Sequence, residues 1–212
     1  MADLEFFFDP VCPWAYITSR WVCEVRDRRS YDVVWRPISL YFVNDSTVAD
    51  WYDADYRRGH LTGLEGLRIA TEIEARQGNG GVDAFYAAAG DFIHRQRRQR
   101  ELKADSMHGW TTMLSESGFD PSLAAFATDQ HHDAAIRAST ELALTRTGTD
   151  VGTPILTFHP GQPDENSFFG PVIATIPRGE QAVTLWDAIE LIATTSGMNE
   201  LKRSNRILPD FA

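Results

Sequence analysis

Cys12 is the residue in this sequence best placed to do chemistry. It directly precedes Pro13, where an apolar run over residues 4–8 gives way to a helical pattern. The unpaired N–H groups and the positive dipole at a helix start favour a thiolate, and cysteine pKa values fall well below about 8.5 there. We therefore predict that Cys12 is substantially ionised, and nucleophilic, near neutral pH. Asp9 opposes this by like charge, and a buried apolar cysteine is the alternative interpretation.

The second cysteine, Cys23, lies eleven residues further along the same predicted helix. At ~1.5 Å per residue the two positions are roughly 16 Å apart, which is beyond the reach of a disulfide. No Cys12–Cys23 disulfide is expected, and we interpret Cys23 as a packed residue.

The run Cys12-Pro13-Trp14-Ala15 has the layout of a Cys-X-X-Cys motif whose second cysteine is replaced. Cys-X-X-Cys between a strand and a helix is the thioredoxin-like redox signature. Here the attacking thiol is kept, Pro13 and Trp14 form the turn, and Ala15 stands in the resolving position. Chemistry at this site is therefore expected to use one protein thiol.

The two ends of the chain carry the elements that must position this turn. Aromatic and β-branched runs alternate with helical periodicity there, which predicts an α/β domain whose first two strands are parallel. The predicted elements are strand 4–8, helix 13–28, strand 31–40, strand 155–158, strand 167–170 and helix 180–195. A turn-rich segment, residues 159–166, predicts a hairpin between the third and fourth strands.

The middle of the chain shows helical periodicity alone, which predicts a large all-helical insertion. The expected helices are 64–77, 83–98, 120–126 and 133–146, with residues 78–81 as a loop. We divide the chain into residues 1–43, the first part of an α/β domain, residues 44–149, an inserted helical domain, and residues 150–212, the second part.

Thr153-Pro154 directly precedes the third predicted strand. Thioredoxin-like folds place a cis-proline loop opposite the active cysteine, although only about 5–6% of X–Pro bonds are cis. By that analogy we predict that the Thr153–Pro154 bond is cis, and that this loop contacts Cys12 and presents its backbone to a bound thiol or disulfide.

Six segments together resemble the DsbA-like mycothiol-dependent nitroreductase family of actinobacteria. They run in order along nearly the whole chain: residues 8–10, 12–14, 17–21, 150–154, 168–172 and 176–180. The resemblance implies a thioredoxin-like fold with a helical insertion, Cys12 as the redox-active thiol, and mycothiol as the low-molecular-weight thiol, with glutathione as the other choice. Some family members reduce nitroaromatic compounds. His94 lies in a stretch that resembles a family segment, so it is expected to face the cleft and bind thiol or substrate.

Ala15 departs from the family pattern, because the reductases have a second cysteine there. Three functions stay open. The first is a monothiol cycle, in which Cys12 attacks a disulfide and a second small thiol releases it. The second resembles the kappa-class glutathione transferases and the 2-hydroxychromene-2-carboxylate isomerases, which bind a thiol cofactor without a protein disulfide. The third is a binding or chaperone-like protein without turnover.

Charge and composition exclude several partners. The chain has 20 basic and 30 acidic residues, a net charge of −10, so nucleic acid is not an expected partner. The acidic start and the lack of a long apolar run predict a cytoplasmic protein that does not enter a membrane. Lys103 and Lys202 are the only lysines, a bias of GC-rich bacterial genomes. The expected partners are a small thiol and a small, aromatic substrate, and a homodimer stays open.

Two clusters of basic side chains have simpler interpretations than a site. His131 and His132 suggest a metal, but adjacent residues point to different sides of a helix, so no metal site is predicted. Residues 94–100 hold four arginines, enough to bind an anion, although a solvated helix end is the favoured interpretation.

Overall fold

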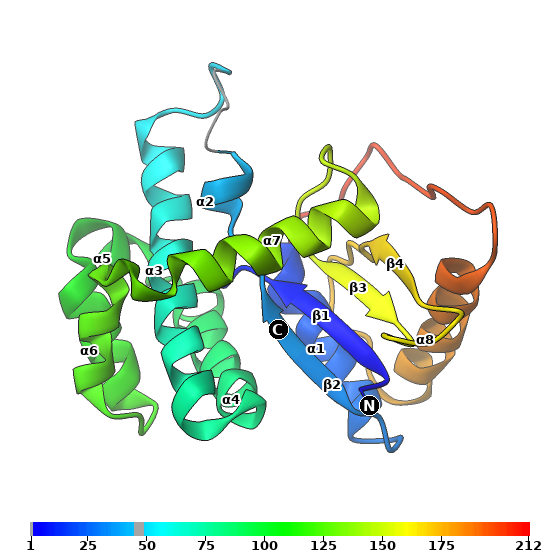
Figure 1. Ribbon diagram of the computed structural model, residues 1–212, viewed down its shortest axis with the longest axis horizontal. Helices are drawn as coiled ribbons and strands as arrows, with labels where there is room; N and C mark the ends of the chain where they lie inside the picture. The colour runs from blue at the N-terminus through cyan, green and yellow to red at the C-terminus, as the bar shows by residue number, and fades with distance from the viewer. Residues whose placement is uncertain (1, 45–48) are drawn as a thin grey trace.

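A four-stranded sheet joins the two ends of the chain in a computed structural model that describes residues 2–44 and 49–212 (Figure 1). The strand order is β2-β1-β3-β4. β1 (Leu4–Phe8) runs parallel to β2 (Val33–Pro37) and antiparallel to β3 (Ile155–Phe158), which pairs antiparallel with β4 (Asn166–Phe169). The predicted parallel pair and the predicted hairpin are therefore confirmed.

The alternation of side chains along β1 gives the sheet two covered faces. All five β1 residues are buried, as expected of a central strand. Leu4, Phe6 and Phe8 belong to the main hydrophobic core, whereas Phe7 belongs to a smaller cluster with Ile155. The second face is therefore thinner, and one helix is enough to cover it.

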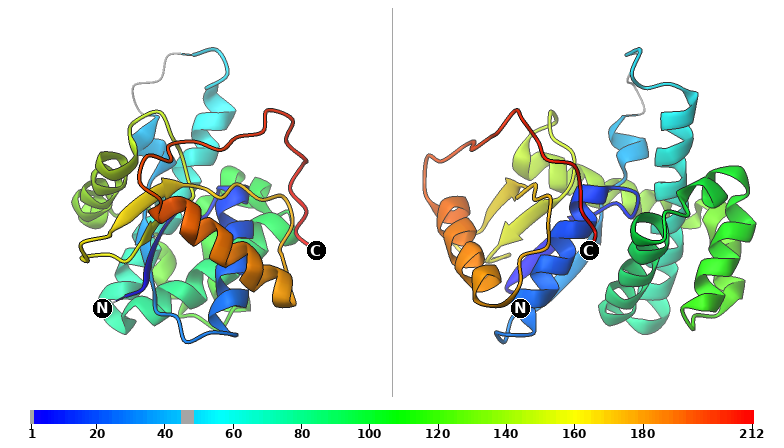
Figure 2. Two further views of the ribbon diagram at one scale, coloured as in Figure 1. Left: turned by 90° about the vertical axis from the view of Figure 1, so that its right-hand side faces the viewer. Right: turned by 180° about the vertical axis from the view of Figure 1, so that it is seen from behind.

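The helices α1 (Pro13–Arg26) and α8 (Gly179–Thr194) cover one face of the sheet, and α7 (Asp133–Thr147) covers the other (Figures 1 and 2). Trp21 of α1 donates its indole N–H to the Ala182 carbonyl at 2.9 Å, which joins α1 to α8. Ala143 of α7 belongs to the smaller cluster. This three-layer arrangement places the start of α1 at the end of β1.

Glu5 is the buried charge that ties α7 to the sheet. Its side chain bonds Arg36 of β2, and its other oxygen accepts from Arg146 of α7 at 2.6 Å. Two guanidinium groups therefore satisfy a carboxylate that would be costly to bury alone.

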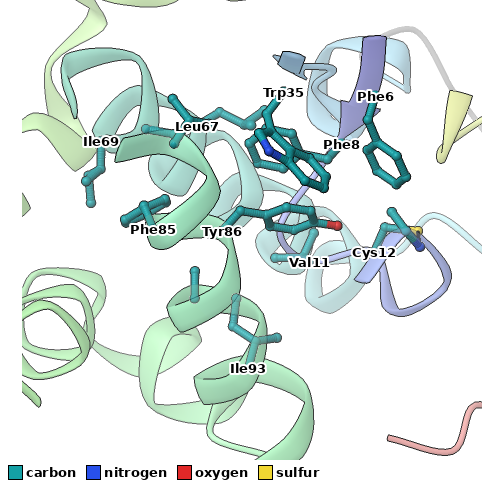
Figure 3. Close-up of a cluster of buried hydrophobic side chains, with 14 of the residues drawn as sticks. Phe6, Phe8, Val11, Cys12, Trp35, Leu67, Ile69, Phe85, Tyr86 and Ile93 are labelled. Atoms are coloured by element: carbon teal, nitrogen blue, oxygen red, sulfur yellow. Dashed lines mark hydrogen bonds between the residues drawn. The ribbon is translucent and has the colours of Figure 1, made fainter. Parts of the chain in front are cut away.

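The remaining described helical segments lie between β2 and β3, the interval in which the sequence predicts the insertion. They are α2 (Leu40–Val43), α3 (Ala54–Gln77), α4 (Asn79–Gly90), a π-helical turn (Asp91–Arg95), α5 (Gln99–Ala104), α6 (Ser106–Glu116) and two 3-10 segments (Pro121–Thr128 and Gln130–His132). Tyr86 of α4 stacks on Phe8 of β1 with ring centroids 4.1 Å apart, and Trp35 packs beside both (Figure 3). These helices and the sheet therefore share one core.

Several helix boundaries differ from the sequence prediction. α3 begins ten residues before the predicted start, at Ala54, because Asp53 caps it by accepting from the Tyr56 N–H at 2.8 Å. Its first turns lack apolar periodicity, so no pattern marks them. α5 and α6 were not predicted either, and Asp105 caps α6 in the same way, by accepting from the His108 N–H.

The predicted loop at residues 78–81 is largely helical, and Asn79 explains why. Gly78, at φ +74°, ends α3, and α4 begins with Asn79. The Asn79 side chain accepts from the Trp35 N–H at 2.8 Å and donates to the Trp35 carbonyl at 2.9 Å. These two hydrogen bonds fix the start of α4 to β2. The glycines around Asn79, taken alone, favour a loop.

The absence of a side chain at Gly63 lets α3 approach the turn that follows β1. A Cβ at this position would overlap the Asp9 carboxylate and lie 2.9 Å from Val11 Cγ2. α3 therefore presses directly on residues 9–11, immediately before Cys12.

Gly63→Ala is expected to lower the free energy of unfolding by about 1–3 kcal/mol, because the added methyl group overpacks a buried contact. Gly80→Ala is the matched control, since Gly80 is also in a helix but a Cβ there meets nothing within 4 Å. Gly80→Ala should leave the free energy of unfolding unchanged or raise it by less than about 1 kcal/mol. Urea unfolding of the three proteins measures the difference, and equal stabilities would contradict the close approach.

Candidate active site at the start of α1

Cys12 caps the N-terminus of α1 with its thiol. Its sulfur accepts a hydrogen bond from the Ala15 N–H at 3.4 Å, and Pro13 occupies the first helical turn, where no N–H is needed. The residue is only 6% exposed. The sequence prediction of a cysteine at a helix start is confirmed, and its sulfur is the capping atom.

The loop before β3 faces this sulfur. The Thr153–Pro154 peptide bond is cis, and Cys12 Sγ–H donates to the Thr153 carbonyl at 3.3 Å across 141 residues of sequence. Thr153 is held by its own hydroxyl, which donates to the Phe7 carbonyl at 3.0 Å. The predicted cis bond and its contact with Cys12 are therefore both confirmed.

The ionisation predicted for Cys12 is wrong for this structure. Burial raises the pKa of the Cys12 thiol to about 12, which outweighs the lowering by the Ala15 N–H, and Asp9 raises it further. The helix start acts as expected, but the sequence does not show that the sulfur is enclosed. Cys12 is a neutral thiol here, and it must gain contact with water or a ligand before it ionises near neutral pH.

Asp9 holds the turn between β1 and α1. It is fully buried, and its two oxygens accept from the Val11 N–H at 3.1 Å and the Leu40 N–H at 2.8 Å. Burial raises the pKa of Asp9 to about 7 despite these bonds. From the sequence, Asp9 is expected only to oppose a Cys12 thiolate by like charge. Its structural role was missed, although an aspartate between an apolar strand and a proline is a typical turn signal.

The predicted turn residues differ in accessibility. Pro13 and Trp14 are half-buried, and Trp14 packs against the main core. Ala15 is completely buried one helical turn below the sulfur. A side chain at position 15 is therefore enclosed with Cys12.

His94 contacts the active-site turn through Pro10. Its Nε2 lies 2.9 Å from the Pro10 carbonyl, so this nitrogen carries the hydrogen and donates. Burial lowers the pKa of His94 to about 4, which makes the ring neutral. The ring stacks on Tyr16 of α1 at 5.3 Å. His94 therefore lies beside the turn, with its ring against α1.

Tyr16 and Tyr86 are site residues that sequence reasoning missed. Tyr16 follows Cys12 by one turn, and its N–H donates to the Cys12 carbonyl at 3.1 Å. The Tyr86 hydroxyl is on the side of its ring nearest Cys12 (Figure 3). Burial raises the pKa of Tyr86, and Cys12 contributes in the same direction. No sequence pattern singles out either side chain, since aromatic residues more often build a core.

The other sequence candidates lie away from the turn. Cys23 is a free thiol on the intact helix α1, so the prediction of no Cys12–Cys23 disulfide is confirmed. The His131 and His132 rings are 4.7 Å apart, contrary to the expected separation, because they lie in a 3-10 turn and not in an α-helix. Among residues 2–44 and 49–212, no three His, Cys, Asp or Glu side chains are grouped to hold a metal ion.

Comparison with known proteins gives the fold and the family. The family model described as Rv2466c-like, mycothiol-dependent nitroreductase Rv2466c, matches residues 11–203. Among curated proteins, the uncharacterized protein Rv2286c of Mycobacterium tuberculosis is 28% identical over 206 residues, which is 96% of this chain and 82% of that protein.

Two solved structures share the fold at low sequence identity. A 2-hydroxychromene-2-carboxylate isomerase is 12% identical with a TM-score of 0.59, over 88% of this chain and 94% of that one. The cytosolic disulfide reductase DsbM of Pseudomonas aeruginosa, solved with GSH, is 14% identical with a TM-score of 0.57, over 89% of this chain and 99% of that one. The predicted α/β, DsbA-like thioredoxin fold is therefore confirmed. In the part of the chain that the structure describes, no helix is long and apolar enough to cross a membrane.

Cys12 should remain a thiol over the neutral range, because burial raises its pKa to about 12. The rate of alkylation by iodoacetamide, followed at Cys12 by peptide mapping, should rise by roughly tenfold per pH unit from pH 7 to 10 without reaching a plateau. Asp9→Asn should increase this rate above neutral pH, since it removes a nearby negative charge. Exposed Asp129→Asn is the control and should not change it. A plateau near neutral pH would contradict the enclosed neutral thiol.

Proposed function

The chain belongs to the Rv2466c-like mycothiol-dependent nitroreductase family, and from that premise we propose that it is a monothiol thiol–disulfide oxidoreductase with Cys12 as its nucleophile. The observation that carries the proposal is the position of the Cys12 sulfur. It caps α1 and lies 3.3 Å from the Thr153 carbonyl, beside the cis Thr153–Pro154 bond. A disulfide that enters between helix and loop meets one thiol and one backbone acceptor.

The reaction proceeds in two exchange steps. In the first, Cys12 sulfur bonds to one sulfur of a disulfide R–S–S–R′, the S–S bond breaks, and the thiol proton of Cys12 ends on the departing R′–SH. In the second, a small thiol R–SH attacks the mixed disulfide on Cys12, forms R–S–S–R and returns a proton to Cys12. The net reaction is R–S–S–R′ + R–SH → R–S–S–R + R′–SH, so no internal disulfide is needed.

The raised pKa of Cys12 makes access to the sulfur the controlling event. A ligand that replaces the Thr153 contact also brings polar atoms or water to the sulfur, which reverses part of the effect of burial. The Ala15 N–H then remains to stabilise negative charge on the sulfur. Thr153, Pro154 and His94 are proposed to shape the thiol-binding surface, and Pro13 and Trp14 to fix the turn.

Family membership supports mycothiol as the small thiol, with glutathione as the other candidate. We propose the cytoplasm as the compartment, since small thiols keep protein thiols reduced there. A small aromatic compound is the proposed second substrate.

A second function is favoured by the state of the sulfur itself. A buried neutral thiol that already donates a hydrogen bond to a carbonyl can donate to a bound cofactor's thiolate instead. That role resembles the thiol-cofactor site of a transferase or isomerase, and it fits the absence of a second cysteine at Ala15.

Cys12→Ser is expected to abolish thiol–disulfide exchange between mycothiol and a model disulfide, by at least about 100-fold, because the covalent intermediate is lost. Cys23→Ser is the matched control and should keep the wild-type rate. Ala15→Cys should form an internal disulfide with Cys12 and gain dithiol reductase activity, since positions three apart share a helix face.

The three variants separate the two functions by initial rates with mycothiol and with glutathione. Equal rates for wild type and Cys12→Ser would show that Cys12 is not the nucleophile. If Ala15→Cys forms its disulfide but reduces nothing, the transferase-like function is the better account.

A further inference from the structure

Phe211 fills an aromatic niche beside the active-site turn. Its ring stacks on His94 with centroids 5.4 Å apart and planes at 20°, and it lies 6.2 Å from the Tyr16 ring. His94 bonds the Pro10 carbonyl, and the Tyr16 N–H bonds the Cys12 carbonyl. A ring in this niche therefore touches two residues that are themselves bonded to the turn around Cys12.

The segment that delivers Phe211 is attached at few points. After α8, residues 196–212 run back to α1 without helix or strand (Figure 2). Every residue from Asn199 to Leu208 is exposed. Near its end the segment is held by the Asp210 N–H, which donates to the Ala174 carbonyl at 2.8 Å, and by the Phe211 ring. Such a segment opens at low free-energy cost, so another ring can compete with Phe211.

Phe211 lines two cavities, and arginines line both. One, of about 330 Å³, is lined by His94, Arg95, Arg97 and the carboxylate of Asp210, as well as Phe211. The other, of about 260 Å³, is lined by Arg20, Arg95 and Arg178. The volume of the first is within the range usual for small-molecule sites, about 300–1,000 Å³.

Of the three arginines that line the second cavity, Arg20 alone forms no ion pair with a described residue. Its Nε donates to Ser19 Oγ at 3.2 Å, but its buried Nη2 has no hydrogen-bond partner among the described residues. Its guanidinium lies 5.6 Å over the Tyr16 ring, the same ring that Phe211 contacts.

The two side-chain carboxylates that line this second cavity, Glu24 and Asp27, leave Arg20 available. Glu24 is engaged by Arg28, Arg178 and the Gly179 N–H. Asp27 is exposed and pairs with Arg26 at 3.8 Å. Arg95 pairs with Asp91 at 2.9 Å but is itself 57% exposed, so it can turn to a ligand.

We propose that the niche held by Phe211 is a binding site for planar aromatic ligands that carry a negative charge. The ligand ring replaces Phe211 against His94 and Tyr16, and its anionic group binds Arg20 and Arg95. The idea that this ligand is the aromatic substrate rests on the proposed function. Binding of the ligand does not need turnover. Phe211 acts as an internal competitor that keeps the niche closed when no ligand is present.

Calorimetric titration with three probes tests charge and planarity separately. Naphthoate is planar and anionic, naphthylmethanol is planar and neutral, and cyclohexanecarboxylate is anionic without a planar ring. Naphthoate should bind the intact protein at least about tenfold more tightly than either of the others, since a guanidinium–carboxylate bond is charge-assisted. Equal affinities for all three would overturn the proposal.

Variants test the residues, with thermal unfolding to confirm that each is folded. Phe211→Ala should tighten naphthoate binding several-fold, while Leu208→Ala, an exposed neighbour in the same segment, should not. Arg20→Gln should remove the preference for naphthoate over naphthylmethanol, with a smaller loss for Arg95→Gln, and exposed Arg203→Gln is the control. If either Phe211→Ala or Arg20→Gln leaves naphthoate binding unchanged, the proposed binding site is wrong.

Cys12→Ser separates this inference from the proposed function. It should bind naphthoate as wild type does, because the niche does not use the sulfur. If wild-type protein exchanges disulfides but binds no naphthoate, the inferred aromatic site is wrong and the proposed function stands. Binding without any thiol-dependent activity would support the niche and overturn the proposed function.

Discussion

The enclosure of the Cys12 sulfur between the start of α1 and the Thr153 carbonyl is the constraint on which the site depends. The Ala15 N–H on one side and the carbonyl on the other give the sulfur one donor and one acceptor, and both partners are fixed by backbone. A helix start alone would favour a thiolate, but burial outweighs it and raises the pKa to about 12. The reactivity of this thiol is therefore governed by what opens the contact.

That contact depends in turn on the helices between β2 and β3. Gly63 allows α3 to lie against Asp9 and Val11, and Asp9 bonds both Val11 and Leu40 of α2. His94, in the π-helical turn after α4, bonds the same turn at Pro10, and Tyr86 of α4 stacks on Phe8 at the end of β1. Because the sheet and these helices share one core, a movement of the helical part would be transmitted to the residues around Cys12. The same helices thus hold the turn in place.

The sequence predicts the α/β frame well, because strands and a hairpin are local patterns, and it predicts the cis loop only by analogy with thioredoxin-like folds. It misses what depends on contacts between distant segments. The helical start at Asn79 depends on hydrogen bonds to Trp35, and the high pKa of Cys12 depends on its burial, neither of which a pattern shows. Phe211 is the clearest case: its ring meets His94 and Tyr16, which are more than a hundred residues away in sequence.

The central claim, that Cys12 carries the small thiol, is tested most directly by intact-mass and peptide mass spectrometry after incubation with mycothiol disulfide. The account predicts one added mycothiol on Cys12, its removal by excess mycothiol, and no adduct in Cys12→Ser. The adduct should form slowly at neutral pH, because burial keeps the sulfur protonated. An unmodified Cys12, or an adduct confined to Cys23, would contradict the account.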